Sequence, residues 1–306
     1  MPSAGADWGE MIKLFYCTDA NFGDAMSPMV VAKLSGQEVR PAGMWNADMM
    51  AIGSVFYRGD YFMVDTHHAG LKHQLKAAMF DFRRNTSRPI SVWGSGFLQY
   101  PTFQDSHSMR SLKVFALRGL HTRKILESFE LMRPDEKIAY GDPGLLFADL
   151  FDIRAKPKYD VGIVPHKFDS DQGWNSKLED AFNRVGINAK VIDVTDNPLK
   201  VVSEIAKCEK IISSSLHGLI VADSLGIPNL HMTISTLGHS QRDYELKFQD
   251  YYSAFGEHMP NVVLADDLLG NPIKYMNENA YGHVNSCNIN EAKDTLIRAF
   301  PFKERV

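Results

Sequence analysis

The chain has 306 residues, of which 44% are hydrophobic and 23% are charged, and its formal net charge is -4. This length predicts about two domains, and this balance is that of an ordinary soluble globular protein. Because there is no basic excess, the composition argues against a nucleic-acid-binding protein.

The sequence gives no sign of export or of a membrane span. The N-terminal stretch has neither a basic region nor an apolar core, and no uninterrupted apolar run approaches the roughly 18 residues that a span requires. Cys17, Cys208 and Cys287 are widely separated and match no disulfide or zinc spacing. We therefore expect a cytoplasmic protein with no membrane span and no disulfide framework.

Strands and helices are predicted to alternate in both halves of the chain, which is typical of parallel α/β sheets. The strands are expected at residues 12–17, 49–55, 90–96, 114–118, 161–164, 188–193, 210–213 and 229–232. The helices are expected at residues 24–34, 120–131, 145–151, 175–185, 198–208, 216–226 and 291–300. The charged stretch 153–160 predicts a boundary between domains 1–155 and 156–306. The last helix is a candidate to pack back on the N-terminal domain.

The most informative stretch is residues 210–228, in which a short apolar strand is followed by three serines and an apolar helix. Any of Ser213, Ser214 or Ser215 is a suitable helix cap, and the free N–H groups at a helix start attract an anion. His217 lies near this helix start, where an imidazole is well placed to protonate a phosphorylated substrate. The alternative is that the serines cap a core helix and His217 is a structural histidine.

Other candidate residues follow predicted strands, at the sheet edge where open α/β sheets bind ligands. Asn21, Gly23 and Asp24 lie on the first strand-to-helix loop, although Asp24 is equally suited to cap the helix. Small residues end two further strands and permit close approach of a ligand to the backbone; they are Gly53, Ser54, Gly94 and Ser95.

Charged residues also occupy this predicted edge. Arg118 ends the strand at 114–118, so we expect its guanidinium to point into the crevice above the sheet, where it suits a phosphate or a carboxylate. The alternative for Arg118 is a surface salt bridge. His166 follows the strand at 161–164 in the same way.

Several familiar sites are not favoured. The Gly94–Gly96 stretch lacks the third glycine of a dinucleotide fingerprint, and no Walker A pattern occurs, which argues against a nicotinamide enzyme and a P-loop ATPase. Three histidines between residues 67 and 73 do not have the spacing of a zinc protease. Asp169 and Asp171 match a short metal-binding pattern that often arises by chance. We expect no metal and no cofactor.

Seven short motifs in this order and spacing resemble the polysaccharide pyruvyl transferase family, and most of all its bacterial exopolysaccharide ketal-forming branch. The resemblance covers roughly residues 12–256. The motifs are Asn21-Phe22-Gly23-Asp24, Ala51-Ile52-Gly53-Ser54, Trp93-Gly94-Ser95-Gly96, Arg118-Gly119, Gly141-Asp142-Pro143, Val164-Pro165-His166 and Ser214-Ser215-Leu216-His217-Gly218.

This resemblance implies two Rossmann-like domains that face each other across a cleft, similar to the GT-B glycosyltransferase arrangement. It implies phosphoenolpyruvate as the donor and a sugar unit as the acceptor, with no cofactor. A lipid-linked acceptor would bring the protein to a membrane face without a span. Some relatives carry an arginine two residues before the histidine, where this chain has Ser215. That departure leaves Arg118 as the better-supported cation.

With a phosphoenolpyruvate donor, His217 is the expected general acid and Asp24 the candidate base for an acceptor hydroxyl. Arg118 is expected to bind the anionic groups of the donor together with Ser214 and Ser215. His166 is expected to assist the donor or the acceptor. The remaining expected substrate contacts are Asn21, Gly23, Gly53, Ser54, Gly94, Ser95 and Lys247.

Two other functions are compatible with the same pattern. A GT-B type glycosyltransferase or a nucleotide-sugar epimerase would share the two-domain cleft and the anion site at a helix start. A non-catalytic sugar-binding member would bind an acceptor sugar but would release no phosphate from phosphoenolpyruvate.

Overall fold

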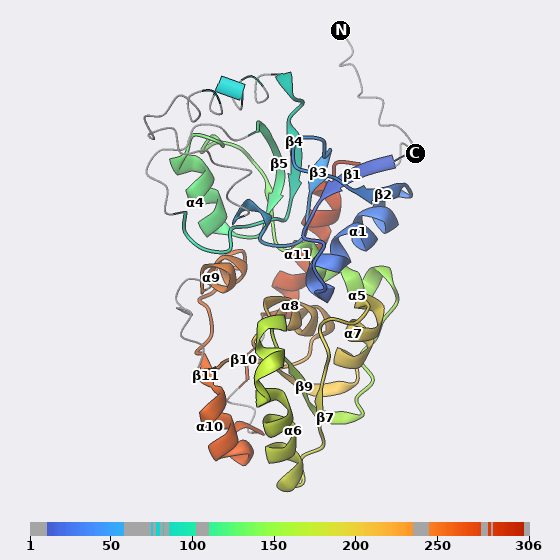
Figure 1. The fold of residues 1–306 in the computed structure, drawn as a ribbon, viewed down its shortest axis with the longest axis vertical. Helices are drawn as coiled ribbons and strands as arrows, with labels where there is room; N and C mark the ends of the chain where they lie inside the picture. The colour runs from blue at the N-terminus through green and yellow to red at the C-terminus, as the bar shows by residue number, and fades with distance from the viewer. Residues whose placement is uncertain are drawn as a thin grey trace.

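The computed structural model describes residues 11–57, 75, 78–79, 82, 86–101, 110–234, 245–276, 281–282 and 284–302 (Figure 1). It contains two sheets, and every strand pairing within them is parallel. The predicted α/β class with two parallel-sheet units is therefore confirmed. Among the described residues, no helix is both long and apolar enough to cross a membrane.

The N-terminal unit is built on a six-stranded sheet in the order β2-β1-β3-β4-β5-β6. Its strands are β1 (Met11–Phe15), β2 (Glu38–Pro41), β3 (Met49–Met50), β4 (Ile90–Trp93), β5 (Leu112–Leu117) and β6 (Ala139–Tyr140). Its helices are α1 (Phe22–Ser35), α4 (Leu120–Ser128) and α5 (Phe147–Leu150), with 3-10 turns η1 (Val55–Tyr57) and η2 (Pro143–Leu146).

The C-terminal unit is built on a five-stranded sheet in the order β11-β10-β9-β7-β8. Its strands are β7 (Tyr159–Val164), β8 (Ala189–Val191), β9 (Cys208–Ser213), β10 (Asn229–Thr233) and β11 (Val263–Leu264). The helices are α6 (Trp174–Arg184), α7 (Pro198–Ile205), α8 (Leu216–Leu225), α9 (Glu245–Ser253), α10 (Ala265–Gly270) and α11 (Ser286–Ala299), with η3 (Lys167–Gln172) and η5 (Pro272–Met276).

Local chemistry explains where these elements begin and end. The side chain of Asn197 accepts a hydrogen bond from the N–H of Leu199 at 2.9 Å, and Pro198 occupies the first position of α7, where a proline fits best. The predicted strand at 49–55 is cut short after β3, because Gly53 adopts φ 107° and turns the chain. The aromatic segment around residues 247–252 forms α9, a helix that the sequence did not predict.

Each sheet has a point where the strand order reverses, and ligands of open α/β sheets bind at the carboxyl ends of the strands there. In the N-terminal sheet this point lies between β1 and β3, and in the C-terminal sheet between β7 and β9. Asp24 and Gly53 follow the first pair of strands, and His166 and Ser214 follow the second. The candidate residues therefore lie at both switch points.

The two units pack closely along their helices. α1 contacts α7, while η2 and α5 contact α8, and α8 is buried from Leu216 to Asp223 at the centre of the molecule (Figure 1). α11 crosses back to β5 and β6 of the N-terminal sheet. There the indole N–H of Trp93 donates to the carbonyl of Leu296 at 2.9 Å.

α9 lies between β10 and β11 of the C-terminal sheet in the chain but packs on α4 of the N-terminal unit (Figure 1). The approach is close because Gly119, just before α4, has no side chain: a Cβ there would lie 1.7 Å from the carbonyl oxygen of Asp250. The hydroxyl of Ser253 also accepts the N–H of Leu120 at 2.8 Å. α9 thus joins the two units.

Replacing Gly119 with alanine should lower the free energy of unfolding by about 1–3 kcal/mol, the usual cost of overpacking, since a backbone carbonyl cannot rotate away. Urea denaturation measures this loss. Gly43→Ala is the control, because its added Cβ would meet nothing within 4 Å. Equal unfolding midpoints for the two variants would contradict the contact between α9 and Gly119.

Candidate functional site

The switch points of the two sheets meet where α1 and α8 begin. A Cβ added at Gly23 would lie 2.1 Å from Nδ1 of His217, so the imidazole lies directly against the start of α1. Nearby, Lys167 of the C-terminal unit forms an ion pair with Asp19 of the N-terminal unit, with 3.2 Å between Nζ and Oδ2. The site is therefore composed of both units.

His217 is almost enclosed at this contact, with 8% of its surface exposed. Its Nε2 atom is buried and has no hydrogen-bond partner among the described residues. The nearest acid to Nε2 is Asp142, whose Oδ2 lies 3.7 Å away and is itself buried without a partner in the described part of the chain. Asp142 belongs to one of the seven motifs, but the sequence analysis did not assign its side chain to the site.

Asp24 faces the same space from the first turn of α1. Burial raises the pKa of its carboxyl group, while the positive charge of His217 and a hydrogen bond from Asn21 oppose that rise. The amide of Asn21 donates to Oδ2 of Asp24 at 3.1 Å, and Asn21 itself caps α1. The helix-cap interpretation of Asp24 is therefore wrong. A Cβ at Gly53 would lie 2.7 Å from Oδ1 of Asp24, so the glycine makes room for this carboxylate.

His166 begins the loop after β7 and is tied to the serine turn. Its N–H donates to the hydroxyl oxygen of Ser214 at 2.8 Å and to the carboxylate of Asp169 at 3.3 Å. Burial lowers the pKa of His166 to about 3, and the positive charges of Lys247 and Lys167 lower it further. The imidazole of His166 is therefore neutral at neutral pH.

The serine turn can present backbone N–H groups to a ligand. The hydroxyl of Ser214 is engaged, because it donates to Asp169 and accepts from His166. Ser215 is the N-cap of α8 but makes no capping bond through its side chain. Among the described residues, nothing accepts a hydrogen bond from the N–H of Leu216 or His217. These two groups at a helix start are suited to an anion.

Lys247 enters the site from α9. It is 8% exposed, and its pKa is lowered to about 8, first by burial and then by the charge of Arg118. The carboxylates of Asp24 and Asp169 oppose that shift, so the ammonium lies within the electrostatic reach of both units. Lys247 is therefore a buried cation within electrostatic reach of the carboxylates of Asp24 and Asp169.

His231 is a further residue that the sequence analysis missed. It lies in the middle of β10, paired with Ser213 at the end of β9, and its ring stacks on Phe248 at 3.9 Å between centroids. Its Nδ1 atom is buried and has no partner in the described part of the chain. Burial, together with the charge of Lys247, lowers the pKa of His231 to about 3.

The expectation that Arg118 points into the crevice is wrong. Its guanidinium is enclosed, with 1% exposed, and forms an ion pair with Asp250 at 3.1 Å between Nε and Oδ2. It also donates to the hydroxyl of Ser54 at 2.7 Å and to the carbonyl of Phe97. The alternative of a surface salt bridge is wrong as well, because the pair is buried. The side chains of Arg118 and Ser54 thus contact each other, and their expected contacts with substrate stay predictions.

Gly94 and Ser95 have structural partners within the chain, and their expected contacts with substrate stay predictions. A Cβ at Gly94 would lie 2.1 Å from Cδ of Pro143, so this glycine makes room for the turn that carries Asp142. Ser95 is fully buried, and its hydroxyl donates to the carbonyl of Ala51. Gly94 and Ser95 therefore help to fix the turn at Pro143 and the segment at Ala51.

The described residues contain no group of three or more histidine, cysteine or acidic side chains that could hold a metal ion. The carboxylate of Asp169 is engaged by Ser214 and His166. The histidines between residues 67 and 73, and the side chain of Asp171, lie outside the described residues.

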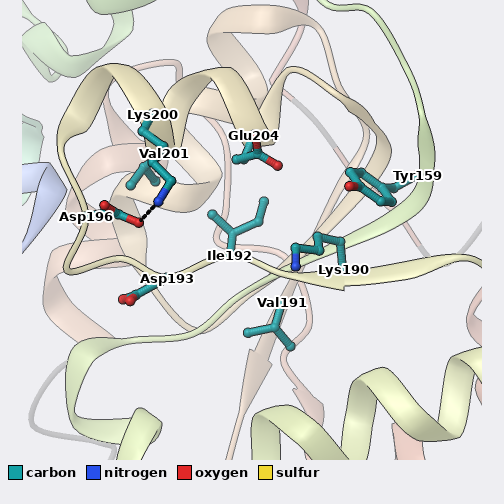
Figure 2. A pocket seen from close by; sticks show the side chains of 9 residues that line it. All are labelled: Tyr159, Lys190, Val191, Ile192, Asp193, Asp196, Lys200, Val201 and Glu204. Carbon is teal, nitrogen blue, oxygen red and sulfur yellow. Dashed lines mark hydrogen bonds and ion pairs between the residues drawn. The ribbon is translucent and has the colours of Figure 1, made fainter.

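A separate groove of about 360 Å³ lies between β8 and α7 (Figure 2). It is lined by Tyr159, Lys190, Val191, Ile192, Asp193, Asp196, Lys200, Val201 and Glu204. Lys200 forms an ion pair with Asp196 at 2.5 Å. Because lysines and carboxylates are mixed, the groove presents no single charge, and it shares no residue with the site between the units.

A family model described as polysaccharide pyruvyl transferase matches residues 56–236. An uncharacterised protein of Acanthamoeba polyphaga mimivirus is 34% identical over 177 residues, which cover 56% of this chain and 57% of that protein. The succinoglycan biosynthesis protein ExoV of Rhizobium meliloti is 29% identical over 167 residues, which cover 54% of this chain and 47% of ExoV. The chain thus spans about half the length of the curated relatives it matches.

Two solved structures match the chain with low scores. A functionally uncharacterised protein of Klebsiella pneumoniae gives a TM-score of 0.40 at 12% identity, covering 83% of this chain and 92% of that one. The spinosyn rhamnosyltransferase SpnG, complexed with thymidine diphosphate, gives 0.39 at 11% identity, covering 94% and 96%. Scores this low carry no argument about function.

Replacing His231 with phenylalanine should reduce the amount by which the free energy of unfolding falls when the pH is lowered. The folded-state pKa of about 3 lies below the ordinary value of 6.5. Between these values the unfolded chain binds a proton that the folded chain does not, so acid favours unfolding. The His231 contribution lost between about pH 7 and about pH 5 is about 2 kcal/mol.

Guanidinium denaturation of the wild type and His231→Phe at the two pH values measures this difference. His258→Phe, at an exposed position, is the control and should keep the wild-type dependence. An unchanged pH dependence in His231→Phe would show that His231 does not titrate as the buried site requires.

Proposed function

Because the chain belongs to the polysaccharide pyruvyl transferase family, we propose that it transfers the pyruvyl group of phosphoenolpyruvate to two hydroxyls of a sugar. The product is a pyruvate ketal, and phosphate is released. The main support is His217, which lies at a helix start whose first N–H groups have no partner among the described residues, and whose charge, like that of Lys247, acts on Asp24. The name of ExoV, a succinoglycan biosynthesis protein, favours a saccharide acceptor.

The chemistry requires one proton on carbon and a place for two anionic groups. Protonation of the methylene carbon of phosphoenolpyruvate makes a methyl group and an oxocarbenium-like centre, which one sugar hydroxyl attacks. Phosphate leaves with the electrons of its bond to carbon, and the second hydroxyl closes the ring. One hydroxyl proton replaces the proton given to carbon and the other leaves on phosphate, so the reaction balances without a co-reactant.

Lys247 and the N–H groups of Leu216 and His217 are the proposed contacts for the anionic donor. Lys247 is a buried cation whose charge acts on Asp24 and Asp169, whereas the guanidinium of Arg118 is enclosed by Asp250, Ser54 and Phe97. A lysine kept in a buried site interacts with a dianion through a low local dielectric, which strengthens the contact. Binding the dianion would in turn favour the charged form of Lys247.

His217 is the proposed general acid, since its Nδ1 lies against the start of α1, on the side of Asp24. Asp24 is the proposed base for an acceptor hydroxyl, because burial raises the pKa of its carboxyl group toward the working range. The neutral imidazole of His166 is suited to hydrogen bonding with the donor or the acceptor rather than to charge pairing. Asn21 and Gly53 hold Asp24 in place.

The proposed reaction needs no metal and no cofactor. The setting that fits it is the cytoplasm, where phosphoenolpyruvate is available as a metabolite. A lipid-linked saccharide acceptor would place the protein at a membrane face without a span.

The direct experiment measures phosphate release from phosphoenolpyruvate with a panel of galactosides, glucosides and mannosides. Acceptor-dependent release is the expected result. Thermal stabilisation by nucleotide sugars but not by phosphoenolpyruvate would instead favour a glycosyltransferase or an epimerase. Binding of a sugar without any phosphate release would favour a non-catalytic member.

Replacing His217 with alanine should lower the turnover number for phosphate release by about 10²-fold or more, since it removes the proton donor to carbon. The assay is the same phosphate release at saturating donor and acceptor. His258→Ala, at an exposed position, is the matched control. Near-wild-type turnover in His217→Ala would refute its role as the acid.

Replacing Lys247 with methionine should raise the KM for phosphoenolpyruvate about tenfold or more, because a charged hydrogen bond to an anion contributes about 1.5–3 kcal/mol. In the wild type, that KM should also rise above about pH 8, where the pKa of Lys247 lies. Lys200→Met, in the separate groove, is the control. A donor KM that is unchanged in Lys247→Met would exclude Lys247 from donor binding.

A further inference from the structure

Asp142 faces the general acid from the opposite unit. It lies on the turn after β6 in the N-terminal unit, whereas His217 begins α8 in the C-terminal unit. The distance from Oδ2 of Asp142 to Nε2 of His217 is 3.7 Å. Asp142 is fully buried, and the side chain of His217 is 10% exposed. The carboxylate and the imidazole therefore meet away from water.

Both facing atoms lack another partner among the described residues. A buried polar atom without a hydrogen bond typically lowers the free energy of unfolding by about 1–3 kcal/mol. Two such atoms that face each other are therefore destabilising unless they share a proton. A proton on Nε2 of His217 would satisfy both atoms after a movement of less than about 1 Å, since N–H to carboxylate hydrogen bonds span about 2.7–2.9 Å.

The carboxylate of Asp142 is held rigidly in this orientation. Its Oδ1 atom accepts the N–H of Gly144 at 2.8 Å, which fixes the side chain as the cap of η2. Gly141 adopts φ 130°, and Gly94 leaves room for Pro143, so the turn has little freedom to carry the carboxylate elsewhere. One oxygen of Asp142 supports the turn, and the other remains for the imidazole.

We propose that Asp142 is the positioning residue of His217: it accepts the Nε2 proton and thereby keeps Nδ1 as the nitrogen that exchanges a proton with the substrate. The two ring nitrogens of His217 are distinct in this structure, because Nε2 faces Asp142 while Nδ1 faces Gly23 at the start of α1. A carboxylate that fixes the tautomer of a catalytic imidazole and stabilises its protonated form is a recurring device in enzymes.

The role in catalysis rests on the proposed pyruvyl transfer, but the tautomer of His217 does not. The two units must be together for the contact to exist, since one partner comes from each. Asp142 therefore makes the acid competent only when η2 and α8 are packed against each other, as they are in this structure.

The test is the ¹⁵N spectrum of histidine-labelled protein at alkaline pH, with the His217 signal assigned by its loss in His217→Gln. The expected wild-type result is a proton on Nε2. Asp142→Asn keeps the volume and the carbonyl acceptor for Gly144, but it offers an N–H to Nε2, so the proton should move to Nδ1. A wild-type proton on Nδ1, or an unchanged tautomer in a folded Asp142→Asn protein, would overturn the inference.

Asp149→Asn is the matched control, because Asp149 lies on α5 of the same unit and pairs with Lys293 at 2.8 Å and Arg154 at 3.0 Å. It should leave the tautomer of His217 unchanged; a change there would show that the signal does not report on Asp142. If Asp142→Asn does not fold, the wild-type spectrum alone decides between the two tautomers.

Kinetics provide the second measurement. Asp142→Asn should lower the turnover number for phosphate release by about 10²-fold or more, while the KM for phosphoenolpyruvate stays within about threefold. Unchanged turnover would overturn the positioning role. If the wild type releases no phosphate, the proposed function fails, while the spectrum still decides whether Asp142 fixes the imidazole.

Discussion

The buried ion pair between Arg118 and Asp250 is the contact on which the site between the two units depends. Asp250 also accepts hydrogen bonds from the N–H of Thr122 at 2.8 Å and from its hydroxyl at 2.6 Å, so both carboxylate oxygens bind the N-terminal unit. Removing one partner of a buried pair typically costs about 3–5 kcal/mol, because the other charge is left uncompensated. The pair therefore fixes α9 on the N-terminal unit, and α9 carries Lys247 into the site.

Burial controls the charge of the site. It lowers the pKa of Lys247 and of His166 and raises that of Asp24, so each group is shifted toward its neutral form. Such a site is suited to an anion, because the bound negative charge favours the charged form of Lys247 that burial disfavours. The same enclosure strengthens each electrostatic contact made with the transition state.

The sequence was sufficient to predict what depends on local pattern. The alternation of apolar strands and helices indicated two parallel sheets, and the residues that follow strands, such as Asp24 and His166, do lie at the switch points of those sheets. Contacts between distant segments carry no local signal. Arg118 and its partner Asp250 are 132 residues apart, and His217 and its partner Asp142 belong to different units. For this reason neither the enclosure of Arg118 nor the position of Asp142 was predictable from the sequence.

The isotope content of the product made in deuterated water tests the proposed proton transfer from His217 to carbon. If His217 delivers an exchangeable proton to the methylene carbon of phosphoenolpyruvate, the sugar ketal formed in this solvent must carry a single deuterium in its methyl group, with phosphate released in equal amount. Proton and carbon NMR of the isolated saccharide would show it. A ketal without deuterium, or a saccharide that gains no methyl group while the donor is consumed, would contradict the account.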